Sequence, residues 1–232
     1  MESKTLIKVN NCRIENSKRI PVQDFSWEMK TGEAWLVVGP NGGGKADFLQ
    51  AIDGGFGSKI VPNLPKGEKE VPLYSNLFED SVESVSLERA ARIIQEERAE
   101  DESEFAEGGV DHGRTGRIFI AEGIVGKIKK GSEPPSLCAE LDAYPEIKLC
   151  GVEKILDRGI KYMSTGEIRR TLLARALVSR KKLLLLSDPF AGLDAESRGI
   201  LLDFFDTIAG KQLSDSKNDS TFPRIILSME RY

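Results

Sequence analysis

The sequence is poor in the residues that cross-link small domains or bind metals. It has three cysteines and one histidine among 232 residues. Cys12, Cys138 and Cys150 are odd in number and form no C-x-x-C pair, which argues against a disulfide framework and against a zinc site. We therefore expect no metal-binding cluster of cysteine and histidine, and a reducing compartment such as the cytoplasm.

Long apolar runs and an excess of basic charge are also absent. No apolar run approaches the roughly 20 residues that a membrane-spanning helix needs, and residues 1–14 lack the apolar core and cleavage site of a secretion signal. We expect a cytoplasmic protein that could lie peripherally at the inner face of a membrane. A formal net charge of −4 gives no reason to expect a nucleic-acid partner.

Short apolar segments and helical periodicities alternate in the outer thirds of the chain. Strands are predicted at 5–9, 25–29, 34–39, 70–75, 181–190 and 224–229. Residues 10–21 are typical of a turn. The strand at 34–39 is predicted to be buried on both faces of its sheet. Helices are predicted from 46, over 86–100, 164–180 and 195–211, and in pieces broken around Pro145. Residues 101–116 are acidic and then glycine-rich, which is typical of a surface loop. The order predicts an α/β fold with a largely parallel sheet and a helical insertion.

The stretch VVGPNGGGKADF, residues 37–48, lies between a predicted strand and a predicted helix. It follows the phosphate-loop pattern G-x-x-x-x-G-K-[ST] at Gly39, Gly44 and Lys45 and departs from it at Ala46. The glycines at 42–44 let backbone N–H groups converge on phosphate oxygens, and Lys45 supplies a positive charge. Ala46 lacks the hydroxyl that ligates Mg²⁺. Taken alone, the stretch could also be a glycine-rich turn without function.

Three further motifs follow in order. They are MSTGE at 163–167, LLLLSDPF at 183–190 and AGLD at 191–194. Ser164 and Glu167 form a capping-box pattern that opens a helix, and an apolar strand ends at Asp188. Each motif taken singly could be an ordinary helix cap or turn.

With these motifs, the chain resembles ATP-binding cassette (ABC) ATPases, and among them the ModF, or photorepair PhrA, type, which is named for molybdenum transport. The resemblance covers about residues 5–229 and is most specific over 162–198. It implies the P-loop NTPase fold with an antiparallel β part, as one ATP-binding domain over 1–232. Residues 1–80 and 161–232 would form its core, and 81–160 the helical insertion that leads into the signature motif. Proteins of this type carry two cassettes, and this chain has one.

The resemblance also implies site residues. The ATP-binding residues would be Gly39, Pro40, Asn41, Gly42, Gly43, Gly44, Lys45, Ala46 and Asp47. The signature residues, which act on nucleotide held by another cassette, would be Ser164, Thr165, Gly166 and Glu167. Asp188 stands where the family has the glutamate that orients the attacking water, and Glu88 stands in the glutamine loop. Met229 would replace the switch histidine, and Cys12 the aromatic residue that stacks on adenine.

Both positions that bind the metal in this family are changed, because Ala46 and Ser187 replace its hydroxyl and carboxylate ligands. ATP is therefore the expected cofactor, with Mg²⁺ binding in doubt and hydrolysis by this chain weak or absent. Three functions stay open: a subunit of ATP-driven transport, of molybdate by the family's name; a nucleotide-binding pseudo-ATPase with a regulatory or structural role; and a scaffold that has lost nucleotide. The partners implied are a second cassette, identical or different, and a membrane permease.

Overall fold

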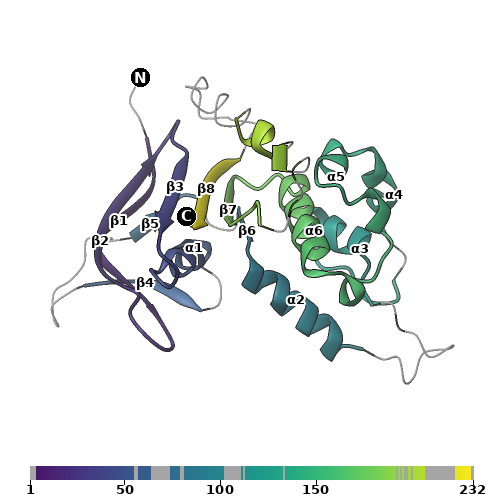
Figure 1. Cartoon of the computed structure of the whole chain (residues 1–232), viewed down its shortest axis with the longest axis horizontal. Helices are drawn as coiled ribbons and strands as arrows, with labels where there is room; N and C mark the ends of the chain where they lie inside the picture. Colours follow the sequence, from purple (N-terminus) through teal and green to yellow (C-terminus); the bar gives the residue numbers. More distant parts are fainter. Residues whose placement is uncertain are drawn as a thin grey trace. The chain divides into compact units, whose positions relative to one another are not determined.

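A computed structural model of the chain describes residues 4–54, 57–63, 74–78, 81–101, 111, 113–132, 134–191, 193, 195, 198–199, 201–206 and 223–230. They form two compact units (Figure 1). The first unit takes its residues from Met1–Ser84, Lys181–Pro189 and Phe205–Tyr232, and the second from Val85–Arg180 and Phe190–Phe204. Residues 161–180, which the sequence assigned to the core, thus lie with the helical insertion.

The first unit contains an antiparallel sheet. Strand β1 (Thr5–Asn16) pairs with β2 (Val22–Lys30), β4 (Ser58–Pro62) and β5 (Tyr74–Asn76). The sequence predicted a turn from residue 10, but β1 continues to Asn16. The continuation includes an irregularity between Val9 and Cys12, where Asn11 has a φ of 45°. Such a bulge bends a strand without ending it, and asparagine tolerates this conformation better than most residues.

The second sheet of this unit has the strand order β3-β8-β7-β6. Strand β8 (Arg224–Glu230) runs parallel to both β3 (Trp35–Gly39) and β7 (Leu183–Ser187), and β6 (Val82–Val85) follows. This arrangement confirms the predicted α/β fold with parallel and antiparallel parts. The predicted burial of β3 on both faces is wrong: Leu36 and Val38 are 54% and 57% exposed, because only alternate residues of the strand pack on the core.

Helix α1 (Lys45–Asp53) contacts strands of both sheets. Its Leu49 and Ile52 join a core to which β1 contributes Ile7 and Val9 and β7 contributes Leu183 and Leu185. Burial of each such side chain contributes about 1.5–3 kcal/mol to folding. This core fixes the start of α1, and with it the glycine-rich loop.

The second unit is helical. Helix α6 (Thr165–Val178) contacts α2 (Leu87–Ala99), α3 (Gly116–Val125) and α5 (Pro145–Leu149), and α4 (Leu137–Glu140) contacts α3. The predicted helices over 86–100 and 164–180 are confirmed, as are the helical pieces around Pro145. Helix α3 was not predicted, because its apolar residues do not form the single stripe that marks an amphipathic helix.

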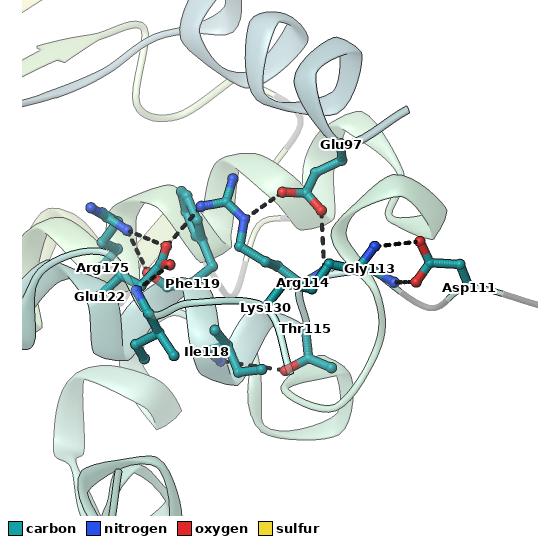
Figure 2. Close-up of polar contacts among 11 residues, drawn as sticks. Glu97, Asp111, Gly113, Arg114, Thr115, Ile118, Phe119, Glu122, Lys130 and Arg175 are labelled. Atoms are coloured by element: carbon teal, nitrogen blue, oxygen red, sulfur yellow. Dashed lines mark hydrogen bonds and ion pairs between the residues drawn. The ribbon is translucent and has the colours of Figure 1, made fainter. Parts of the chain in front are cut away.

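A network of charged side chains surrounds two buried carboxylates in this second unit (Figure 2). Arg114 donates to Glu97 of α2 and, over 2.7 Å, to Glu122 of α3. Both carboxylate residues are only 4% exposed. Arg175 of α6 lies 3.7 Å from the Glu122 carboxylate and 4.5 Å from the centre of the Phe119 ring. Since an unpaired buried charge is costly, the network couples the positions of α2, α3 and α6.

Some sequence predictions fall partly or wholly outside the described residues. These are 70–73 of a predicted strand, 102–110 and 112 of the predicted loop, Gly192 and Asp194 of the AGLD motif, and 196–197, 200 and 207–211 of a predicted helix. Residues 201–206 of that helix are helical. Within the described ranges, no helix has the length and apolar character that crossing a bilayer requires.

Candidate phosphate-binding site

The loop between β3 and α1 has a backbone that only glycine adopts readily. Gly42 and Gly44 have φ values of 77° and 88°, in the left-handed region. A Cβ on Gly43 would lie 3.0 Å from the backbone oxygen of Pro40, to which Gly43 N–H donates over 3.1 Å. Gly44 is the N-cap of α1 and has no side chain that could cap the helix. The loop therefore presents the positive end of α1 with its first N–H groups open to an anion.

Lys45 folds back across the loop. Its ammonium donates to the carbonyl oxygens of Gly39 over 2.8 Å and of Pro40 over 3.0 Å. These are neutral acceptors, so a phosphate oxygen could replace them with a stronger, charge-assisted bond. The next residue, Ala46, places only a methyl group in the first turn of α1.

Asp47, which the sequence grouped with the ATP-binding residues, is bound by side chains from elsewhere in the unit. Its Oδ1 accepts from Asn16 Nδ2 over 2.7 Å and from Ser58 Oγ over 2.8 Å. Its Oδ2 lies 3.4 Å from Arg19 Nη2. Sequence reasoning missed Asn16, Arg19 and Ser58, because none of them belongs to a motif. Asn16 and Arg19 lie 31 and 28 positions before Asp47, and Ser58 lies 11 positions after it.

The end of β7 lies at the same edge of the sheet as the loop. Val37 of β3 and Ser187 of β7 are both level with Ser228 of β8, which lies between these strands. Ser228 Oγ donates to Ser187 Oγ over 3.3 Å, and its carbonyl accepts from Asp188 N–H over 2.9 Å. Asp188 has a φ of 45°, so the chain turns sharply here. Parallel strands bind ligands at their carboxyl ends, and the structure thus brings the loop and Asp188 to one such edge.

The oxygen ligands for a cation at this edge are few. Ala46 offers none, Ser187 offers a hydroxyl, and Asp188, which follows it, offers a carboxylate. Among the residues that the structure describes, no group of three or more histidine, cysteine, aspartate or glutamate side chains is arranged to hold a metal ion.

Cys12 does not lie where a nucleotide base could stack. Its side chain is 0% exposed, belongs to the core of the first unit, and donates to the carbonyl of Asn10 over 3.3 Å. The expected correspondence with an adenine-stacking residue is therefore wrong. Met229 lies in β8, and Glu88 lies exposed in the first turn of α2, in the second unit.

The predicted capping box at the start of α6 is confirmed. Ser164 Oγ accepts from Glu167 N–H over 3.3 Å, and Glu167 Oε2 accepts from Ser164 N–H over 2.9 Å. Arg158 Nη1 donates to Glu167 Oε1 over 2.6 Å. The hydrogen bond from the Ser164 backbone and the charge of Arg158 lower the pKa of Glu167. Thr165 and Gly166 complete the first turn of this helix.

Comparison with known proteins gives the same family as the motifs. The ABC transporter family matches residues 22–191. The ABC transporter ATP-binding protein ModF of Escherichia coli strain K12 is 31% identical over 186 residues, which is 80% of this chain and 33% of ModF. The molybdate/tungstate import ATP-binding protein WtpC of Thermococcus kodakarensis is 27% identical over 182 residues, 78% of this chain and 47% of WtpC. The chain thus spans a third to a half of the length of these relatives.

Solved structures share the fold. MJ1267, an ATP-binding cassette of an ABC transporter, superposes in its ADP conformation with a TM-score of 0.55 at 15% identity, covering 99% of this chain and 82% of that one. A bacterial Atm1-family ABC exporter with ATP bound gives a TM-score of 0.56 at 19% identity, covering 97% of this chain and 34% of the exporter. The family match extends from β2 past the end of β7 and includes the phosphate loop and the capped helix α6. The chain belongs to the ABC transporter family.

Proposed function

We propose that this chain is an ATP-binding cassette that holds nucleotide phosphates in the loop Gly39–Asp47. The observation that carries this proposal is the loop backbone, in which Gly42 and Gly44 are left-handed and a Cβ on Gly43 would lie 3.0 Å from the backbone oxygen of Pro40. Such a backbone at the start of a helix suits phosphate oxygens, and Lys45 adds a charge beside it. Binding of ATP is the role that the family and the names of its relatives suggest.

We propose that Mg²⁺ fits the residues at this site poorly. A magnesium ion prefers carboxylate and hydroxyl oxygens in octahedral geometry, and Ala46 and Ser187 supply at most one weak ligand. Asp188 and Glu88 are the proposed catalytic residues, but Asp188 is one methylene shorter than the family's glutamate. A misplacement of about 1 Å can reduce a rate about 10²-fold. We therefore propose that ATP affinity depends little on Mg²⁺ and that this chain alone hydrolyses ATP weakly or not at all.

Equilibrium binding tests whether the affinity for ATP depends on Mg²⁺. ATP is titrated into the protein with Mg²⁺ or with EDTA, and Lys45→Ala serves as the variant that should lose binding in both conditions. The expected result is similar affinity in the two conditions, with little phosphate release. Strong dependence on Mg²⁺ would reveal metal ligands that replace the two missing ones, and no binding in either condition would favour a scaffold without nucleotide.

The second part of the proposal concerns a partner. The capping box leaves Ser164, Thr165, Gly166 and Glu167 as an ordered helix start, which could act on the γ-phosphate of ATP held by a second cassette, either a copy of this chain or a different one. Removing one such preorganised donor typically reduces a rate about 10²–10³-fold. We expect this chain to stimulate ATP turnover by an intact cassette.

The rate of ATP turnover against added chain, at fixed partner concentration, tests this role. Ser164→Arg should abolish the stimulation, whereas Lys45→Ala should leave most of it. Equal loss in both variants would show that this chain's own site is required and that the donor role is wrong.

We propose that such a cassette serves as the nucleotide-binding subunit of ATP-driven transport; the alternative is a pseudo-ATPase with a regulatory or structural role. Molybdate is proposed as the transported substrate only from the names of ModF and WtpC, with a membrane permease as partner and a cytoplasmic, membrane-peripheral location. Molybdate-dependent ATP turnover in the presence of such a permease would support transport. Turnover that responds to this chain but not to molybdate would favour the regulatory role.

A further inference from the structure

We propose that Arg19 supplies the phosphate-binding loop with the positive charge that a bound divalent cation would otherwise provide. The loop would then bind a nucleoside di- or triphosphate without metal. This inference rests on the proposed binding of ATP. It adds a binding residue from outside the loop and a metal-free form of the ligand. Arg19 belongs to the turn between β1 and β2, not to any motif in the sequence.

The guanidinium of Arg19 lies against both the loop and the start of α1. Its Nη1 donates to the carbonyl of Gly42 over 3.2 Å, and its Nη2 lies 3.4 Å from Asp47 Oδ2. These contacts use two of its five N–H groups, and no other partner contacts it among the residues that the structure describes. The side chain is 53% exposed, so its remaining donors are open to a ligand in solution. Arginine binds phosphate oxygens through such paired donors.

The turn that carries Arg19 is held to the carboxylate of Asp47 through Asn16. Asn16 Oδ1 accepts from the N–H groups of Lys18 and Arg19, both over 2.9 Å, and Asn16 N–H donates to the Arg19 carbonyl over 3.0 Å. Asn16 Nδ2 then donates to Asp47 Oδ1 over 2.7 Å. The backbone of Arg19 is therefore held beside the loop before any ligand binds, which lowers the entropy that binding must overcome.

Charge balance explains why the loop needs this arginine. Asp47 places a negative charge in the first turn of α1, next to the residues that would receive phosphate. Its carboxylate is 14% exposed and accepts bonds from Asn16 and Ser58, which hold it in place without neutralising it. Lys45 alone would only balance Asp47, and with neither Mg²⁺ ligand present the loop would have no net positive side-chain charge. Arg19 restores that charge.

Titration of ATP in EDTA tests the inference, with Arg19→Gln as the main variant. Loss of one charged donor to phosphate should weaken ATP binding about tenfold or more. Lys18→Gln is the matched control, because it removes the neighbouring exposed charge and should change affinity less than twofold. Arg19→Lys should recover part of the loss. Thermal unfolding of each variant should stay near that of the unchanged protein, since a partly exposed ion pair contributes little stability.

The outcomes separate this inference from the proposal on which it rests. If the unchanged chain binds ATP in EDTA and Arg19→Gln binds it within twofold, Arg19 has no role and ATP binding stands. Equal losses in Arg19→Gln and Lys18→Gln would indicate a general charge effect and would also overturn the inference. ATP binding only with Mg²⁺ would refute the metal-free form. No ATP binding by the unchanged chain in either condition would overturn the proposed function itself.

Discussion

Replacement of Ser164 by alanine should weaken the start of α6 without unfolding the second unit. The change removes the oxygen that accepts from Glu167 N–H, which is one half of the capping box. Loss of an N-cap hydroxyl costs roughly 0.5–2 kcal/mol. The bond is long at 3.3 Å, so we expect about 1 kcal/mol or less.

The other half of the box should matter more. Glu167 accepts from Ser164 N–H over 2.9 Å and from Arg158 over 2.6 Å. A hydrogen bond to a charged group contributes about 1.5–3 kcal/mol, but the Arg158 side chain is 45% exposed, and solvent screens that pair. We therefore expect Glu167→Ala to cost about 2 kcal/mol, more than Ser164→Ala.

The contribution of Glu167 should depend on pH in a definite direction. Its pKa in the folded protein is lowered from the ordinary value of 4.5 by the Ser164 backbone hydrogen bond and by Arg158. A group with a lowered pKa stabilises the folded state above the unfolded pKa, and this stabilisation is lost as pH falls through the folded pKa. The difference in stability between the unchanged chain and Glu167→Gln should thus be full at pH 7 and shrink below about pH 4.5.

Chemical denaturation followed by helical circular dichroism measures these differences, and amide hydrogen exchange at residues 164–168 gives a local readout. Thr165→Ala is the control, because Thr165 is exposed and lies in the same helical turn. It should change stability by less than about 0.5 kcal/mol. If Ser164→Ala destabilises more than Glu167→Ala, or if the Glu167→Gln difference grows at low pH, the assignment of the box is wrong.

Three further changes test the two units. Ala46→Ser combined with Ser187→Asp should raise phosphate release by more than the two single changes predict, because both side chains would serve one ion; additive effects would show that metal binding is not the limiting defect. Arg114→Met leaves two carboxylates in the second unit, Glu97 and Glu122, without their main partner. A denaturant titration should show that the free energy of unfolding falls by about 3 kcal/mol. A fall of less than about 1 kcal/mol would contradict the structural role of the network. Gly43→Ala should weaken ATP binding about tenfold, because the new Cβ would lie 3.0 Å from a backbone oxygen of the loop and displace it. Overall stability should not change. Unchanged affinity would show that the loop can shift to accommodate the side chain.

Local patterns in the sequence were enough to predict several parts of the molecule. The glycine loop, the capping box at Ser164 and the strand predicted within 181–190, which the structure gives as Leu183–Ser187, each depend on residues within a few positions of one another, where chain geometry decides the outcome. Their order along the chain indicated the fold class and the family. The sequence was less informative for α3, which lacks an amphipathic stripe, and for the bulge at Asn11 that carries β1 beyond its predicted end.

The surroundings of the loop were decided by tertiary structure. Cys12 is buried because β1 continues through the bulge and turns that residue into the core, which no short-range pattern indicates. Asp47 meets Asn16, Arg19 and Ser58 only because the β1–β2 turn and β4 fold against the start of α1. The sequence by itself predicted a phosphate loop at residues 39–46, and the resemblance implied that Ala46 and Ser187 replace the family's two metal ligands. Only the folded chain determined which distant side chain stands beside that loop, because packing between elements, not spacing along the chain, brings Arg19 there.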